Sequence, residues 1–271
     1  MPLDFIYGTA WKEAETARLT LLALRSGFRA IDTANQRKHY FEAAVGEGLG
    51  AAYDAGLVAR EDLFLQTKFT YRLGQDDRLP FDPAAPLTVQ VAQSMASSLD
   101  HLRTTYVDCY VLHGPASAYE WTGDDSDAWA AMRKERDAGR ALRLGVSNAG
   151  IWHLERMLEK EAEAPAFVQN RCFARTGWDR KVRAFCREHG IAYQAFSLLT
   201  ANRAVLESPL IAGIAKRESA TPAQVVFRFA RAAGMIPLTG TSDAGHMQQD
   251  LASETLNLTG EEIEAIEAIA E

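Results

Sequence analysis

Eight short β-rich runs alternate with longer segments of helical periodicity along the 271 residues of the chain. Strands and helices in strict alternation are the sequence form of repeated βα units, which build a parallel sheet. Eight such units close into one barrel of about 250 residues, so we predict a single (β/α)8 (TIM) barrel domain over residues 1–271. The predicted strands are residues 4–7, 30–32, 63–68, 107–113, 142–146, 166–169, 192–196 and 235–238.

The ends of the helical segments carry residues that normally stop and start helices. Helical periodicity is seen in residues 14–26, 43–55, 87–102, 128–138, 151–162, 179–189, 222–233 and 261–270. Glycine follows five of these segments, at Gly27, Gly56, Gly139, Gly190 and Gly234. A left-handed residue after the last helical turn costs least as glycine, so these positions predict helix ends. Thr221 and Pro222 predict a helix start, because threonine caps and proline fits the first turn.

Two long segments lack a clear period and are predicted to be loops over the mouth of the barrel. They are residues 71–86, which contain Gly74 and three prolines, and residues 114–127. Loops of this length inside a barrel are often functional. The run VGEGLG at residues 45–50 resembles a glycine-rich phosphate loop, but its glycines alternate and no strand directly precedes them. We predict that this run is helical.

Composition argues against several classes of protein. Lys and Arg number 29 against 36 Asp and Glu, a formal net charge of −7, which is unsuited to nucleic-acid binding. No apolar run reaches about 18 residues and no signal peptide is apparent, so we expect a cytoplasmic protein without a membrane span. The cysteines Cys109, Cys172 and Cys186 form no CxxC pair and are expected to be free thiols. Six scattered histidines show no ligand spacing, so no metal site is expected.

Polar residues end several of the predicted strands. They are Asp32, Lys68, His113, Ser147, Asn148, Gln169 and Asn170. The carboxyl ends of the strands meet at one mouth of a barrel, where barrel enzymes build their active sites. Taken singly, Asp32 reads as a turn cap, Lys68 as a solvated strand end and His113 as a half-buried histidine. Three titratable groups of different types at one mouth instead predict a catalytic site.

Eight short motifs occur in order along the chain, each at the end of a predicted strand. They are GTAW at 8–11, GFRAIDTA at 27–34, LFLQTKF at 63–69, YVDCYVLHGP at 106–115, GVSN at 145–148, VQN at 168–170, AFSLL at 195–199 and IPLTGTS at 236–242. With this set, the chain resembles the aldo-keto reductase superfamily over nearly its whole length. The resemblance implies reduction of a small-molecule aldehyde or ketone with a nicotinamide cofactor, most often NADP(H), with NAD(H) also open.

The resemblance implies a catalytic tetrad of Asp32, Tyr40, Lys68 and His113. Tyr40 is eight residues after Asp32, farther than the family usually places its tyrosine, and His39 stays an alternative for that position. Reducing a carbonyl needs a proton donor aimed at the developing alkoxide, and a phenol supplies one. Lys68 would stabilise the phenolate, Asp32 would hold the lysine, and His113 would orient the substrate oxygen or help to protonate it.

The resemblance also implies which residues bind the nicotinamide half of the cofactor. They are Ser147, Asn148, Gln169, Asn170, Phe196 and Ser197. The first four offer hydrogen bonds to the carboxamide, and the alignment leaves the choice between Gln169 and Asn170 open. Phe196 stands where the family commonly has a tyrosine, and it keeps an aromatic face for stacking.

The adenosine half is implied to lie on the IPLTGTS segment and the helix after it. The residues are Thr241, Ser242, His246, Gln249 and Asp250. The family often has a lysine and an arginine here that recognise a 2′-phosphate through charge-assisted bonds. In this chain, either neutral donors at a helix start hold the phosphate beside His246, or discrimination against NADH is weak.

Aromatic residues on the predicted loops are expected to form the walls of the substrate pocket. The candidates are Trp11, Tyr71, Phe81 and Trp121, and such walls suit apolar aldehydes or ketones. The chain ends soon after residues 261–270, so we expect a truncated C-terminal loop and an open pocket. Few residues precede Phe5, so we expect a short N-terminal cap below the barrel.

Two other functions are weighed against the reductase, for which we expect a monomer or weak oligomer. One is a cofactor-binding regulatory subunit with little turnover, which the presence of all four catalytic residues disfavours. The other is a barrel aldolase that uses Lys68 as a Schiff-base nucleophile. The aldolase does not explain the polar cluster at Ser147, Asn148 and Gln169.

Overall fold

Eight parallel strands close into a barrel in chain order, with β1 paired to both β2 and β8. The computed structural model describes residues 3–269. The strands are β1 Ile6–Gly8, β2 Ala30–Asp32, β3 Phe64–Phe69, β4 Cys109–Leu112, β5 Leu144–Ser147, β6 Phe167–Arg171, β7 Ala192–Phe196 and β8 Met235–Thr239. The predicted (β/α)8 architecture is confirmed.

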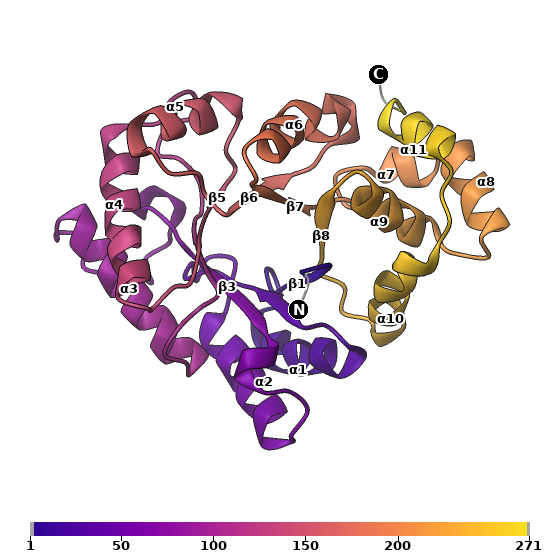
Figure 1. Cartoon of the computed structure of the whole chain (residues 1–271). Coiled ribbons are helices and arrows are strands. Elements are labelled where there is room, and N and C mark those ends of the chain that lie inside the picture. The colour runs from indigo at the N-terminus through magenta and orange to yellow at the C-terminus, as the bar shows by residue number, and fades with distance from the viewer. Residues whose placement is uncertain (1–2, 270–271) are drawn as a thin grey trace.

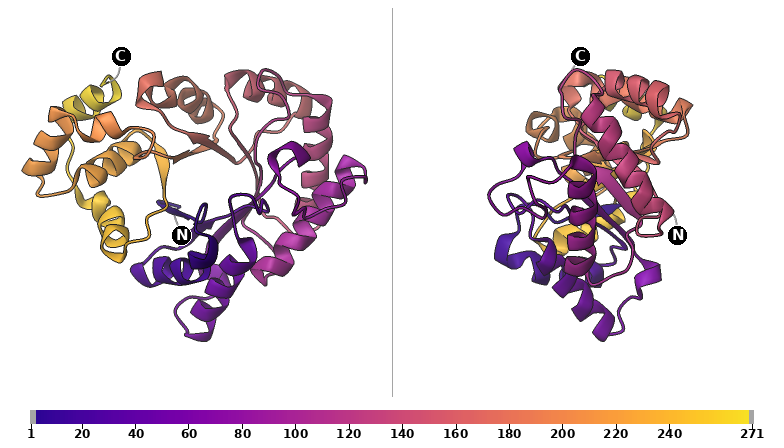
Figure 2. Two further views of the ribbon diagram at one scale, coloured as in Figure 1. Left: turned by 180° about the vertical axis from the view of Figure 1, so that it is seen from behind. Right: turned by 90° about the vertical axis from the view of Figure 1, so that its left-hand side faces the viewer.

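Helices form an outer ring around the strands (Figures 1 and 2). They are α1 Thr16–Ser26, α2 Glu42–Asp54, α3 Leu87–Leu102, α4 Gly123–Asp137, α5 Ile151–Glu161, α6 Arg180–Glu188, α7 Arg203–Leu206, α8 Pro209–Arg217, α9 Pro222–Ala232, α10 Ala244–Ala252 and α11 Gly260–Glu267. The helix punctuation is confirmed: all five predicted glycines have left-handed φ, and Thr221 caps α9 through a capping box. Within residues 3–269, no helix combines the length and the apolar character needed to span a membrane.

Four of the eight predicted strands start and stop one or two residues too early, and those at 30–32 and 192–196 match the structure. The residues before β4 and β5 form only a single bridge between Val107 and Ala141. At the other end, Arg171 pairs with Phe196, so β6 runs two residues beyond its predicted end. The first and last residues of a strand are set by hydrogen bonds to the neighbouring strand. The sequence pattern of a single segment does not show where those bonds begin and end.

The helical pattern misses α7, α8 and α10 and starts α4 too late. α4 begins at Gly123 instead of residue 128, because Thr122 accepts the backbone N–H of Asp125 and closes a capping box. The predicted loop at residues 114–127 is correspondingly shorter. α8 and α10 have nine residues each and are capped by Ser208 and Asp243. Helices this short show only two turns of an apolar stripe.

The glycines of the VGEGLG run let α2 pack closely on its neighbours, and the prediction of helix here is confirmed. A Cβ atom on Gly46 would lie 1.9 Å from the carbonyl oxygen of His101 in α3. A Cβ atom on Gly48 would lie 2.6 Å from the carbonyl oxygen of Ala17 in α1. The alternating glycines therefore serve helix packing and not phosphate binding.

Small apolar clusters fill the interior of the barrel. One contains Ile6 and Leu238, the other contains Cys109 and Phe167, and Leu3 packs against both. Leu3, three residues before β1 begins, thus helps to close the amino-terminal end of the barrel. All three cysteines are free, as predicted, and all three are buried.

Candidate active site

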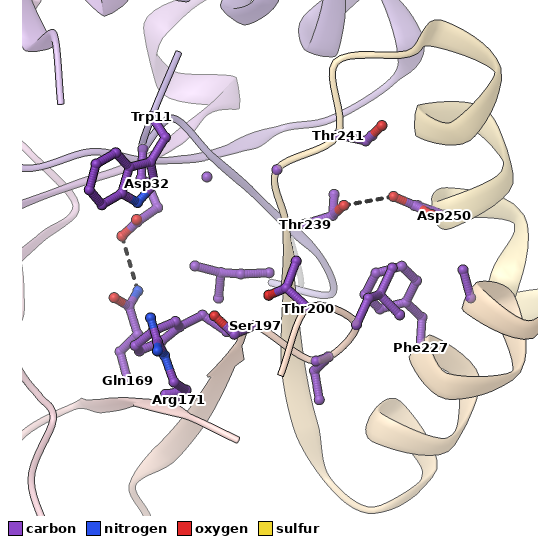
Figure 3. Close-up of a pocket in the computed structure, with 18 of the residues that line it drawn as sticks. Trp11, Asp32, Gln169, Arg171, Ser197, Thr200, Phe227, Thr239, Thr241 and Asp250 are labelled. Carbon is purple, nitrogen blue, oxygen red and sulfur yellow. Dashed lines mark hydrogen bonds between the residues drawn. The ribbon is translucent and has the colours of Figure 1, made fainter. Parts of the chain in front are cut away.

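A cavity of about 1050 Å³ opens at the carboxyl ends of the strands, where the predicted site lies. This volume is at the upper end of the range for small-molecule and cofactor sites, about 300–1,000 Å³. Most of the predicted site residues line it: Trp11, Asp32, Tyr40, His113, Ser147, Asn148, Gln169, Phe196, Ser197, Thr241, His246, Gln249 and Asp250. Figure 3 shows how strands and loops bring several of them together.

An ion pair between the end of β2 and strand β3 lies at the floor of the cavity. Lys68 Nζ is 2.6 Å from Asp32 Oδ1 and donates to the Thr33 carbonyl oxygen at 2.9 Å. Both side chains are almost fully buried. Burial lowers the pKa of Lys68, but the Asp32 carboxylate and Tyr40 together raise it above its ordinary value. Lys68 is therefore an ammonium at neutral pH.

Tyr40 stands beside this pair, in the loop after β2. Lys68 Nζ is 5.1 Å from the centroid of the Tyr40 ring, so the ammonium lies beside the phenol. Burial raises the pKa of the Tyr40 phenol, and the positive charge of Lys68 opposes that rise. The phenol thus keeps its proton at neutral pH, next to a cation that stabilises the phenolate once the proton has left.

The extra residues of this loop form a turn that decides which side chain faces the ion pair. The backbone N–H groups of His39 and Tyr40 both donate to the carbonyl oxygen of Gln36, at 3.1 and 3.0 Å. The turn brings Tyr40 to Lys68 and leaves the His39 ring against Trp11, with centroids 4.1 Å apart. Of the two candidates for the acid position, the geometry therefore favours Tyr40.

His113 approaches Tyr40 from the end of β4. The two rings meet edge to face with centroids 5.9 Å apart, and His113 Nδ1 lies 2.6 Å from Thr70 Oγ1. Burial, followed by the charge of Lys68, holds the pKa of His113 well below its ordinary value. The imidazole is neutral at neutral pH. Since Thr70 engages Nδ1, the other ring nitrogen, Nε2, is available to a ligand beside Tyr40.

Three glutamines form an amide network inside the barrel beneath the cavity. Gln169 Nε2 donates to Asp32 Oδ1 at 3.0 Å and to Gln194 Oε1 at 2.9 Å (Figure 3 shows the first bond). Gln66 Nε2 donates to the same Asp32 oxygen at 2.6 Å, and Gln194 Nε2 donates to Gln66 Oε1 at 2.9 Å. Both N–H groups of Gln169 Nε2 are used within this network, so its Oε1 is the atom that can accept a hydrogen bond from a ligand.

The ends of β5 and β7 complete the wall around Gln169. Ser147 Oγ donates to the Gln169 carbonyl oxygen at 2.7 Å, and Asn148 Nδ2 donates to the His113 carbonyl oxygen at 2.8 Å. Three non-glycine wall residues have left-handed backbone, Trp11, Asn148 and Ser197, with φ of 62°, 55° and 59°. Backbone strain of this kind clusters at functional sites.

The far end of the cavity lies between β8 and α10. Thr239 Oγ1 donates to Asp250 Oδ2 at 2.7 Å (Figure 3), and burial raises the pKa of Asp250 to about 6. Asp243 caps α10, its Oδ1 accepting the N–H of His246 at 2.8 Å. Of the two alternatives that the sequence leaves open, the Asp243 carboxylate at this helix start favours weak discrimination against NADH over neutral donors that hold a 2′-phosphate.

A family model described as the aldo/keto reductase family matches residues 6–271. The chain belongs to this family. An aldo-keto reductase from Mycolicibacterium vanbaalenii is 30% identical, with 96% of this chain and 85% of that protein covered. Human aldo-keto reductase family 1 member C1 is 28% identical, with 95% of this chain and 83% of that protein covered.

Solved structures of aldo-keto reductases superpose on the whole barrel. The aldo/keto reductase from Brucella melitensis has a TM-score of 0.83 and 25% identity, and covers 98% of this chain and 94% of its own. The Bombyx mori aldo-keto reductase in complex with NADP has the same TM-score and identity, and covers 98% of this chain and 88% of its own.

Asn170 does not face the cavity of this aldo-keto reductase. Neighbouring residues of a strand point to opposite faces, so Gln169 points inward and Asn170 outward. Asn170 Nδ2 donates to the Ala149 carbonyl oxygen at 2.8 Å and to Asp179 Oδ2 at 3.0 Å. The alternative between Gln169 and Asn170 is thereby reduced to Gln169 as the residue in the cavity. Ser242 also lies outside the lining, and Lys68 lies beneath it.

Three of the four aromatic side chains predicted to form pocket walls lie elsewhere. The Tyr71 hydroxyl donates to Asp125 Oδ1 at 2.8 Å, and Nε1 of buried Trp121 donates to side chains of α4 and α5. Phe81 is buried in the apolar core. These residues fasten the long loops to the barrel, so loop aromatics alone are a poor sign of a pocket. Trp11, 71% exposed, does line the cavity.

Four residues at the site carry signals that motif reasoning missed: Lys12, Gln66, Arg171 and Gln194. Gln66 stands two residues before Lys68, Gln194 two before Phe196 and Arg171 two after Gln169. Because the period of a strand is two, each shares the inward face of its neighbour. A polar residue at an inward position of an apolar run is the signal that could have found Gln66, Arg171 and Gln194, whereas Lys12 lies outside the strands. Over residues 3–269, no group of three His, Cys, Asp or Glu side chains is placed to hold a metal.

Proposed function

We propose that this aldo-keto reductase reduces aldehydes or ketones to alcohols with NADP(H) as the hydride source. One observation carries the proposal: the protonated phenol of Tyr40 is held against the Lys68 ammonium beside the neutral imidazole of His113. All three groups meet at one end of a long cavity. The NADP in the Bombyx mori relative supports the choice of cofactor.

The residues of the cavity fit a nicotinamide dinucleotide. Gln169 presents a free Oε1, which matches the N–H2 group of a carboxamide. Ser147 and Asn148 flank it with further polar atoms, and Phe196 offers an aromatic face. At the far end, Lys12 donates to the Gly240 carbonyl oxygen and lines the cavity, which places a cation within reach of a pyrophosphate.

The chemistry divides between cofactor and side chains. A bound nicotinamide supplies the hydride, which no side chain can deliver. Tyr40 gives its proton to the carbonyl oxygen as that oxygen becomes an alkoxide. Lys68 stabilises the phenolate left behind, and Asp32 holds Lys68 charged and in place. When Thr70 donates to Nδ1 of His113, Nε2 carries the ring proton and orients the same substrate oxygen.

The Schiff-base alternative fits the structure poorly. A nucleophilic lysine needs a neutral amine, which enzymes obtain by lowering its pKa. In this barrel the pKa of Lys68 is raised, and Nζ is tied to Asp32 and to the Thr33 carbonyl oxygen. Borohydride trapping of a ketone on Lys68 should fail.

The cofactor is tested by titrating the protein with NADPH and then NADH while following tryptophan fluorescence. Trp11 stands on the cavity wall, so a bound dinucleotide should quench it. We expect saturable binding of NADPH, and consumption of NADPH when an aldehyde is added. The variant Trp11→Phe should lose part of the quench while still binding. Absence of binding to both nucleotides would contradict the proposal, and binding without turnover would favour the regulatory subunit.

A further inference from the structure

Arg171 is the last residue of β6 and stands at the mouth of the cavity. It lies two residues beyond Gln169 on the same face of the strand, and Figure 3 shows both side chains on the cavity side. Its guanidinium carbon is 5.6 Å from the centroid of the Phe196 ring. A cation held over an aromatic face is partly fixed in direction before any ligand arrives.

The charge of Arg171 is not neutralised by the protein. Over residues 3–269, its guanidinium makes no hydrogen bond and no ion pair, and Phe196 is its one ring contact. The two carboxylates that line the cavity are already engaged, Asp32 by Lys68 and Asp250 by Thr239. The positive charge of the Arg171 guanidinium therefore remains available to a ligand in the cavity, in a chain whose net charge is −7.

The position of Arg171 separates it from the phosphates of a dinucleotide bound as proposed. It adjoins Gln169 and Phe196, which are proposed to hold the nicotinamide end. The opposite end, between β8 and α10, has its own cation in Lys12, which donates to the Gly240 carbonyl oxygen. An anionic group bound by Arg171 is therefore more readily explained as part of the substrate than as a phosphate of the cofactor.

We propose that Arg171 binds a carboxylate of the substrate, so that the preferred substrates are aldehydes or ketones that carry a carboxylate. This inference rests on the proposed reductase function and names its substrate class. The planar guanidinium matches the two oxygens of a carboxylate, and such bidentate bonds are both strong and directional. Tyr40 and His113 take the carbonyl oxygen, and Arg171 fixes the other end of the molecule.

The test compares two aldehydes of the same chain length, succinic semialdehyde with a carboxylate and butyraldehyde without one. The readout is the ratio of their kcat/KM values with NADPH. We expect the protein to prefer succinic semialdehyde, and Arg171→Gln to lower the ratio roughly 10- to 100-fold, mainly through KM. Arg171→Lys should retain part of the preference, because lysine keeps the positive charge but cannot make the bidentate hydrogen bonds of a guanidinium.

Arg175→Gln is the matched control. Arg175 is also exposed and also packs over an aromatic ring, that of Phe173 at 4.9 Å, but it does not line the cavity. The same loss of charge four residues away should leave the substrate ratio as it is. A fall of equal size in Arg175→Gln would show a general charge effect and overturn the proposal.

Succinate binding gives a second readout that needs no turnover. Quenching of tryptophan fluorescence should report saturable binding to the unmodified protein and binding at least 10-fold weaker to Arg171→Gln. An unchanged substrate ratio with unchanged succinate binding would overturn the carboxylate site and leave the reductase intact. An equal fall in kcat/KM for both aldehydes, together with a raised KM for NADPH, would show that Arg171 binds the cofactor and overturn the proposal. Failure to reduce either aldehyde would count against the reductase, and succinate binding would still decide whether Arg171 holds a carboxylate.

Discussion

Tyr40 and phenylalanine differ by one oxygen atom, and that atom is the proposed proton donor. Tyr40→Phe should lower kcat by about 100-fold or more, the usual worth of a general acid, while NADPH still binds. The measurement is NADPH consumption with an aldehyde, beside a fluorescence titration of the cofactor. His39→Ala is the comparison, and it should lower kcat far less, because the His39 ring packs against Trp11. Normal turnover in Tyr40→Phe would remove the phenol from the mechanism.

Asp243 is a second single residue with a measurable consequence, this time for the choice of cofactor. Its carboxylate caps α10 at the end of the cavity where the adenosine half is proposed to lie, and it would repel a 2′-phosphate there. Asp243→Ser keeps a capping oxygen and removes the charge. We expect the ratio of NADH to NADPH dissociation constants to shift toward NADPH by roughly fivefold. A ratio that does not move would place the phosphate away from this helix start.

At the scale of elements, the contact of α2 with α3 depends on the absence of a side chain. Gly46→Ala would place a Cβ atom 1.9 Å from a backbone oxygen of α3, so the helices must move apart. Overpacking of this kind costs about 1–3 kcal/mol in the free energy of unfolding, measurable by urea denaturation. Gly213→Ala in α8 is the control, because no atom lies within 4 Å of its Cβ position. The control should gain up to about 1 kcal/mol, and equal stability of Gly46→Ala and the original chain would contradict the packing account.

The elements show which parts of the fold were open to prediction from the sequence. The order of eight strands and the helix ends at residues such as Gly27 and Gly234 follow from local chemistry, so they were predicted. Strand limits depend on partners distant in sequence, as the pairing of Arg171 with Phe196 illustrates. α8 and α10 bear caps at Ser208 and Asp243 but are too short for periodicity to reveal.

The site was open to prediction to a similar degree and for related reasons. Motif order led to Asp32, Lys68 and His113 because chemistry restricts those positions to few residue types. The prediction that loop aromatics form the pocket walls is wrong for Tyr71 and Trp121, because these side chains are hydrogen-bonded to residues of neighbouring helices. The sequence does not show such contacts between distant segments. The inward glutamines were missed because motif reasoning stopped at the strand ends.

For the whole molecule, two groups at the cavity make stability depend on pH in opposite directions. The pKa of His113 is lowered by burial, so it adds no penalty above its ordinary pKa and destabilises the fold as the pH falls below that value. The pKa of Asp250 is raised to about 6 by burial, so its stabilising contribution is present in acid and is lost as the pH rises through about 6.

Between pH 6.5 and 5, His113 becomes protonated in the unfolded chain but stays neutral in the folded chain, because its pKa is lowered there. The free energy of unfolding therefore falls by up to about 1.4 kcal/mol per pH unit from this group. His113→Gln should show a shallower fall over this interval in urea unfolding at a series of pH values. The same slope in both proteins would mean that His113 accepts its proton in the folded state.

The central claim is that hydride moves from a nicotinamide to a carbonyl in this barrel while Tyr40 supplies the proton. The most direct measurement uses NADPH doubly deuterated at the nicotinamide C4 position, an aldehyde substrate and mass spectrometry of the product. Our account predicts an alcohol that carries one deuterium on its carbonyl-derived carbon, with little labelled alcohol from Tyr40→Phe. Consumption of the aldehyde without label in the alcohol, or no reaction despite bound NADPH, would contradict it.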